Sequence, residues 1–116
     1  MANTIAVNTT KQAVEQFQGL FTEMWTVKAT ISDQDAIALT TVTEFDCTVA
    51  GVALGDMVLG VSSTVDLNDG TNEAIMTAYV SAANTVTVQV MADEAEFAAD
   101  ALNTAVVRVL VGRPAW

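Results

Sequence analysis

Apolar and polar residues alternate with a period of two along most of the chain, the pattern of β-strands that bury one face. The alternation is most regular over residues 85–90, where every second position is valine. Comparable segments, separated by polar or glycine-containing turns, cover residues 25–31, 36–49, 57–62, 73–81 and 105–111. Closely spaced strands of this kind predict an all-β fold, an antiparallel β-sandwich or a barrel-like domain.

The segment 36–49 is longer than an ordinary strand, so we expect a bulge or corner near residues 40–43. In its second half, Phe45, Cys47 and Val49 fall on one face. Cys47 is the single cysteine, so the chain cannot form an internal disulfide. Its inward position, with no histidine to activate it, predicts a buried structural thiol.

Only residues 9–21 carry a helical pattern. Thr9 and Gln12 fit a capping box. Apolar residues then recur at helical spacing, namely Ala13, Val14, Phe17, Leu20 and Phe21. This pattern predicts a short helix that caps the β core, and an arm that becomes ordered on binding is the alternative. We therefore divide the chain into an N-terminal arm or short helix (1–24) and a β-sandwich domain (25–116).

The composition indicates assembly with a partner. Hydrophobic residues make up 52% of the 116 residues and charged residues 16%, which is more apolar than a typical domain of this size. Part of this apolar surface is expected to meet another subunit. The chain also ends in Trp116, which either folds back onto the domain or anchors on a partner.

The charge argues against two classes of partner. Fourteen acidic residues face four basic ones, for a net charge of −10. The basic residues are scattered, so no basic patch is available for nucleic acid or for an anionic membrane surface. We also find no secretory signal pattern and no apolar run long enough for a conventional membrane span. The sequence thus predicts neither nucleic acid nor membrane as a partner.

Residues with catalytic or metal-binding chemistry are sparse. The absence of histidine excludes histidine triads and most zinc sites, and no phosphate-binding loop occurs. Asp33, Asp35 and the acidic residues of 93–96 fall in predicted loops, where we interpret them as solvated charge. The loop 66–73 has Gly70 at position five rather than six of a calcium loop, so we interpret it as a hairpin turn. We predict no enzyme activity, no catalytic residue, no metal site and no cofactor.

Three segments resemble a module of tailed-bacteriophage structural proteins. They are GVALGDMV at 51–58, AYVSAANTVTV at 78–88 and VRV at 107–109, and the resemblance spans residues 42–111. It is greatest to small capsid decoration (cement) proteins of the β-sandwich type, which commonly sit as trimers on the head. The resemblance implies a homotrimer, synthesised in the host cytoplasm, that binds the outer surface of the capsid in the virion. There it would bridge major capsid protein subunits and stabilise the shell.

Similar modules occur in tail and fibre proteins, so a tail or fibre module with a host-surface glycan-binding role is the alternative function. The resemblance brings no catalytic residues. As candidates for the interface with the partner we select six residues near the two ends of the chain: Phe17, Leu20, Phe21, Trp25, Arg113 and Trp116.

Overall fold

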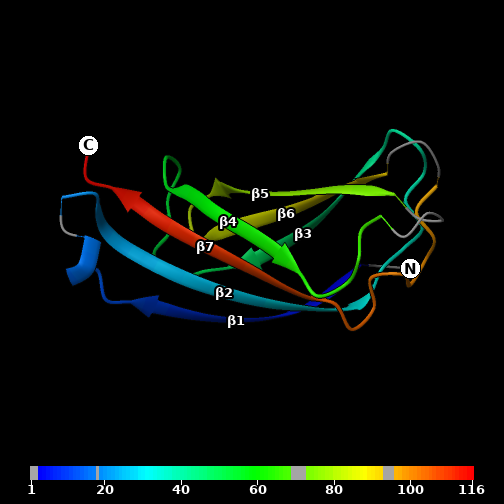
Figure 1. Ribbon diagram of the computed structural model, residues 1–116, viewed down its shortest axis with the longest axis horizontal. Helices are drawn as coiled ribbons and strands as arrows, with labels where there is room; N and C mark the ends of the chain where they lie inside the picture. The colour runs from blue at the N-terminus through cyan, green and yellow to red at the C-terminus, as the bar shows by residue number, and fades with distance from the viewer. Residues whose placement is uncertain (1–2, 18, 69–72, 93–95) are drawn as a thin grey trace.

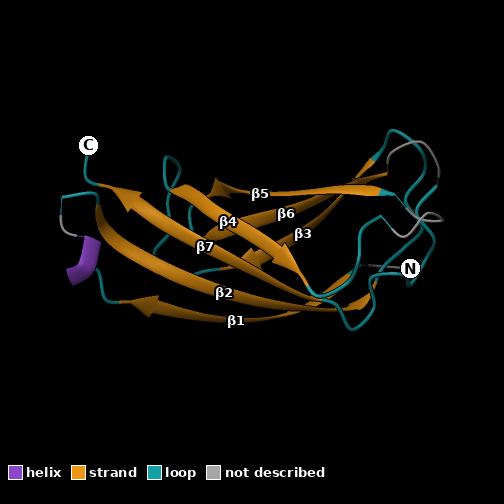
Figure 2. Ribbon diagram, viewed as in Figure 1, coloured by secondary structure: helices purple, strands orange, loops and turns teal. Residues whose placement is uncertain are grey.

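Two antiparallel β-sheets face each other and form a β-sandwich (Figures 1 and 2). The structure is a computed structural model that describes residues 3–17, 19–68, 73–92 and 96–116. The first sheet has the order β1-β2-β7-β4 and the second β3-β6-β5. Their bounds are β1 Thr4–Gln12, β2 Phe21–Asp33, β3 Val42–Thr48, β4 Met57–Ser63, β5 Ala74–Ala82, β6 Thr85–Ala92 and β7 Val106–Pro114. This confirms the predicted β-sandwich, and the sheets do not close into a barrel.

The helix predicted over residues 9–21 is not formed, and this prediction was wrong. Residues 4–12 are strand β1, which pairs with β2 from Thr4 opposite Asp33 to Gln12 opposite Met24. Only a single 3₁₀ turn, η1 (Glu15–Phe17), lies between the two strands in the described residues. Threonine, valine and isoleucine in β1 favour a strand, and a nine-position ladder satisfies the backbone better than a short helix. The boundary that we expected at Trp25 therefore falls inside β2.

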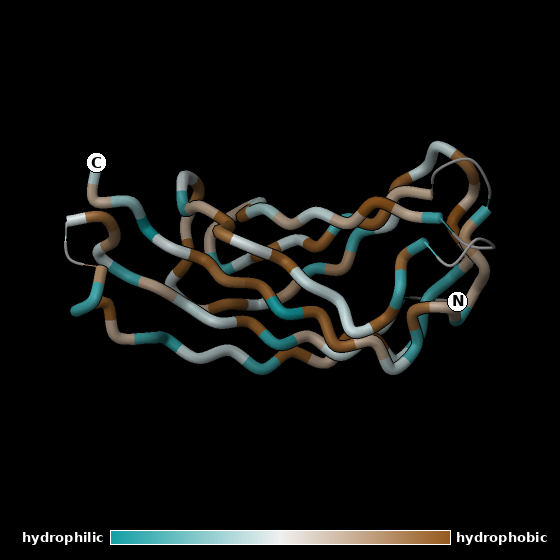
Figure 3. Tube along the Cα trace, viewed as in Figure 1, coloured by the Kyte–Doolittle hydropathy of each residue, from teal (hydrophilic) through white to brown (hydrophobic). Residues whose placement is uncertain are grey.

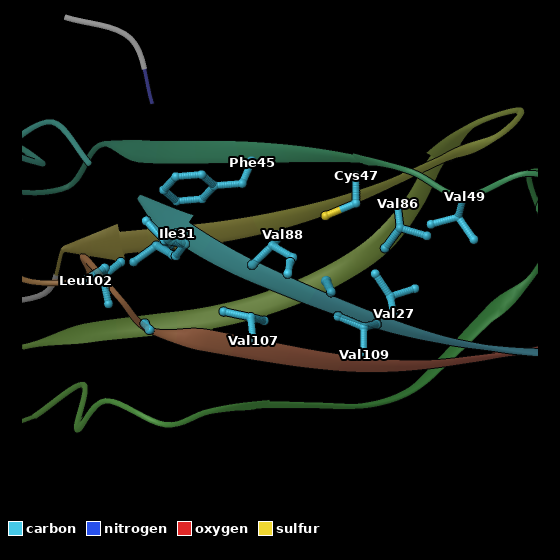
Figure 4. Packing of buried hydrophobic residues seen from close by; sticks show 14 of the residues in the cluster. Val27, Ile31, Phe45, Cys47, Val49, Val86, Val88, Leu102, Val107 and Val109 are labelled. Atoms are coloured by element: carbon cyan, nitrogen blue, oxygen red, sulfur yellow. The ribbon is translucent and has the colours of Figure 1, made fainter. Parts of the chain in front are cut away.

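The inward side chains follow the predicted alternation. Figure 3 shows hydrophobic and hydrophilic positions alternating along the strands, and Figure 4 shows the inward residues meeting between the sheets. Fully buried side chains come from both sheets and include Ile31, Phe45, Val49, Val86, Val88, Val90, Val107 and Val111. Thr87 is also buried, but it points to the face opposite that of Val86 and Val88: its hydroxyl lies 2.7 Å from that of Ser81 and donates a hydrogen bond of 2.7 Å to Asp46.

Cys47 is fully buried, as predicted for a structural thiol. Burial raises the pKa of this thiol to about 11, and the nearby carboxylate of Asp46 adds to the shift. The thiol is therefore protonated and sterically enclosed at neutral pH, both of which lower its reactivity.

The corner expected near residues 40–43 is present. Thr40 has a positive φ of 64°, and β3 begins two residues later at Val42. Residues 36–41 are not part of the strand: Ile37 instead forms an isolated bridge with Phe97 in the loop that precedes β7. The molecule measures 44 × 23 × 22 Å. One of its ends holds η1, the C-terminus and the turn before β4 (Figure 1).

We predict that Val86→Asp unfolds the protein, because a carboxylate would enter a core in which Val86 is fully buried. The expected cost of several kcal/mol is a large part of the stability of a domain this size. Thr77→Asp on the outer face of β5 is the control, and we expect it to cost less than about 1 kcal/mol. Urea unfolding followed by circular dichroism measures both, and equal stability of the two variants would show that the strand register is wrong.

Candidate functional site

Arg113, near the end of β7, holds the turn formed by residues 51–56. Its Nε and Nη2 atoms donate to the two carboxylate oxygens of Asp56, each at 2.9 Å. Nη2 also donates to the carbonyl oxygen of Gly51 at 2.8 Å. This forked, two-bond geometry is the strongest form of arginine–carboxylate pair. The guanidinium therefore clamps the turn to the first sheet.

The Gly-x-x-x-Gly-Asp pattern of the turn has a local structural explanation. Gly51 and Gly55 have φ values of +100° and +98°, which favour glycine. Asp56 also accepts a hydrogen bond of 2.9 Å from the backbone N–H of Ala53, which closes the turn. Gly51 lies against the ring of Trp25: a Cβ added to Gly51 would be 3.4 Å from the nearest ring atom. The pattern on which the family resemblance partly depends thus serves to seat Asp56 beside Arg113.

Trp25 is a core residue, with only 2% of its surface exposed. The guanidinium carbon of Arg113 lies 5.3 Å from the centre of its ring, a cation–π distance. Its indole N–H has no hydrogen-bond acceptor among the described residues, so packing and this contact hold it. Trp25, which we selected as an interface candidate, therefore lies in the core against Arg113 and does not form part of the exposed surface.

Glu23 extends the ion-pair network to β1. It accepts a hydrogen bond from Nη1 of Arg113 and another from Nζ of Lys11 at 2.5 Å. The hydrogen bond from Lys11, followed by the charge of Arg113, lowers the pKa of Glu23 below its ordinary value of 4.5. The hydrogen bonds to Asp56 raise the pKa of Arg113. Two cations and two carboxylates from β1, β2, β7 and the turn thus form one network, which we call the Arg113 hub.

An aromatic cluster lies at the same end of the sandwich. The ring of Phe21 is 6.4 Å from that of Phe17 and 6.1 Å from that of Trp116. Phe21 packs over Gly112, where a Cβ would be 2.8 Å from the ring, so only glycine leaves room for it. The backbone N–H of Ala115 donates to the carbonyl of Leu20 at 2.8 Å and fastens the C-terminus there.

Four of the six interface candidates therefore come together as one surface, which we call the aromatic end: Phe17, Leu20, Phe21 and Trp116. Trp116 folds back onto Phe21, yet 75% of its surface is exposed. Folding back onto the domain therefore does not prevent it from contacting a partner. A fifth candidate, Arg113, belongs to the hub near the end of β7.

Sequence reasoning missed the contribution of strand β4 to this end. Met57 pairs with Gly112, and the Leu59 side chain lies 3.2 Å from the Cβ position of the same glycine. Both are partly exposed, and Leu54 in the neighbouring turn is more so. A register shift between Val58 and Gly60 turns Leu59 toward Phe21. No local sequence pattern signals such a shift.

The remaining sequence expectations concern chemistry and membranes. Among the described residues, no group of three or more His, Cys, Asp or Glu side chains could hold a metal ion. The suspected calcium loop includes residues 69–72, and the acidic run includes 93–95; both lie outside the described residues. Asn68 and Glu73, which flank the first of these segments, form an isolated antiparallel bridge. In the part of the chain that the structure describes, no helix is long and apolar enough to cross a membrane.

Comparisons with family models, with curated proteins and with solved structures found no match for this chain. We therefore infer function from the surfaces of the molecule itself.

We predict that Arg113→Gln lowers the free energy of unfolding by about 2–4 kcal/mol, because the carboxylate of Asp56 would lose its counter-charge. The Asp56 side chain is only 4% exposed, so water cannot replace the guanidinium. Arg108→Gln on the same strand is the control, since Arg108 makes no ion pair with a described residue. Urea unfolding compares them, and equal stability would show that the hub does not hold the turn.

A second prediction concerns pH. Because the pKa of Glu23 is lower in the folded protein than its ordinary 4.5, protonation of Glu23 favours the unfolded chain. Its stabilising contribution is complete well above pH 4.5 and is lost as pH falls through the lower, folded-state value. We expect the unfolding temperature of the wild type to fall more steeply below pH 4.5 than that of Glu23→Gln. Glu96→Gln, which removes an exposed carboxylate, should keep the wild-type profile.

Proposed function

We propose that this protein is a capsid decoration protein of a tailed bacteriophage, and that it docks on the outer surface of the head by its aromatic end. In this proposal three copies form a homotrimer that bridges neighbouring major capsid protein subunits and stabilises the shell. The observation that carries the proposal is the aromatic end itself: exposed Phe17, Leu20 and Trp116 lie together around Phe21.

The composition of the aromatic end supports a docking role. Large apolar side chains that gather on one surface are typical of protein contacts, and tryptophan is enriched among the residues that contribute most to binding. Elsewhere the outer faces of the strands carry mainly threonine, serine and other polar residues, with scattered apolar ones. The aromatic end is therefore the surface best suited to lie against another protein.

The Arg113 hub supports the same role by fixing the aromatic end before docking. The hub joins β1, β2 and β7 to the turn 51–56. Phe21 is the first residue of β2, and Trp116 follows the end of β7. A contact surface that is already ordered loses less conformational entropy on binding. The hub contains equal numbers of cations and carboxylates, so docking above it does not require a charged partner.

The energetics fit a protein that works in several copies. An apolar footprint of about 200 Å² would contribute roughly 5 kcal/mol gross at about 25 cal/mol per Å², before the cost of association. One such contact is weak. Three contacts on one trimer raise the effective concentration of each after the first has formed, and so hold neighbouring shell subunits together.

The test is binding to purified heads that lack the protein. We expect wild-type protein to sediment with the heads and to raise their disruption temperature, and Leu20→Asp to lose at least about 10-fold in affinity through the buried charge. Ile75→Asp is the matched control: Ile75 is 53% exposed on β5 and Leu20 is 54% exposed. It should bind as the wild type does.

Three results would contradict the proposal. They are wild-type protein that never associates with heads, heads that are equally robust without it, and Ile75→Asp losing as much affinity as Leu20→Asp. Labelling of virions with an antibody separates the alternative location, because signal on tails instead of heads would favour a tail or fibre module. Light scattering of the free protein tests the trimer.

A further inference from the structure

A groove of about 670 Å³ crosses the outer face of the first sheet, away from the aromatic end's ring contacts. Residues from all four strands line it, among them Asn8, Thr10, Lys28, Gly60, Ser62 and Arg108. With strands about 4.8 Å apart, a groove across four of them is about 14 Å long. This length accommodates a short chain of sugar rings or amino-acid residues, which is much larger than a single ion.

Gly60 explains why this face is hollowed. It lies opposite Leu110 on the outer face, and no atom of the described residues is within 4 Å of the position that a Cβ would occupy. Its φ lies outside the range that favours glycine, so the backbone does not require glycine here. The missing side chain opens space that a larger residue would fill.

Two cations share the groove without a counter-charge. Lys28 and Arg108 are direct partners across β2 and β7, and like charges placed opposite each other destabilise a sheet. Neither side chain makes an ion pair or a hydrogen bond with a described residue. They are half of the four basic residues of a chain with net charge −10, and none of the described residues that line the groove is acidic. The two side chains are therefore available to bind an anionic ligand.

The other groove side chains are suited to hydroxyl groups. Asn8 and Ser62 flank the two cations in the same cross-strand row, and Thr10 lies in the next row. The side chains of these three residues make no hydrogen bond with a described residue. Each can both donate to and accept from a hydroxyl. Leu110 adds a small apolar surface, of the kind that the carbon face of a sugar ring can cover.

We propose that this groove binds an oligosaccharide that contains uronic acid. The fork of Arg108 would hold a sugar carboxylate by two hydrogen bonds, with Lys28 beside it as a second charge. Asn8, Thr10 and Ser62 would bind the ring hydroxyls of the same and adjoining sugars. Two cations are too few for the dense charge of a nucleic acid. The inference goes beyond the proposed function and does not depend on it.

Calorimetric titration with a trimer of galacturonic acid tests whether the two cations of the groove bind the saccharide. We expect Arg108→Gln and Lys28→Gln each to weaken binding by at least about 10-fold, the equivalent of about 1.4 kcal/mol. Lys11→Gln is the control, because it makes the same change in net charge but lies outside the groove, beside Glu23. It should bind the trimer as the wild type does. The neutral galactose trimer should bind at least 10-fold more weakly.

The shape of the groove is tested by Gly60→Val, which keeps both cations and fills the hollow with a residue that strands accept. We expect this variant to keep the wild-type unfolding temperature and to lose binding of the galacturonate trimer. Leu20→Asp at the aromatic end should keep saccharide affinity, so a failure of head docking and a failure of this site can be told apart.

Several results would overturn the inference. One is the absence of any binding by the galacturonate trimer. Another is a hexaglutamate peptide that binds more tightly than the trimer, which would make an acidic protein segment the occupant. Full binding by a folded Gly60→Val variant, or equal loss in Lys11→Gln, would show that general electrostatic attraction and not the groove is responsible.

Discussion

The ion pair between Arg113 and Asp56 is the contact on which the ordered end of this molecule depends. It is formed across 57 positions of the sequence, between the last strand and the turn before β4. One guanidinium satisfies a nearly buried carboxylate, covers the ring of Trp25 and reaches Glu23. Because these partners belong to different strands, the pair fixes the relative positions of the elements that carry the aromatic end.

The four basic residues fall into two sets with different consequences. Lys11 and Arg113 are paired with carboxylates in the hub, where their charge is used to hold structure together. Lys28 and Arg108 lie opposite each other in the groove and have no such partner among the described residues. The molecule therefore has two surfaces of different chemistry: an apolar end above a neutralised network, and a cationic, hydroxyl-lined groove. A protein that docks by one surface would leave the other accessible.

Sequence reasoning succeeded where the physical signal is local. The period of two over β6 predicted that its valines are buried, because alternate side chains of a strand point to opposite faces whatever its neighbours are. It failed for residues 9–21. There, apolar residues at helical spacing coincide with a chain reversal, and the strand character of Thr4–Gln12 is realised through pairing with β2. A strand needs a partner, and that partner lies beyond any local window.

The sequence by itself determined an all-β fold, either a sandwich or a barrel, with a buried cysteine. It also placed Phe17, Leu20, Phe21 and Trp116 among the candidate contact residues. Only the tertiary structure brought these four together, moved Trp25 into the core and set Lys28 opposite Arg108. The physical reason is the range of the interactions. Burial patterns are set by neighbours in the chain, whereas ion pairs, ring contacts and grooves depend on strand order and register, which join residues far apart in the sequence.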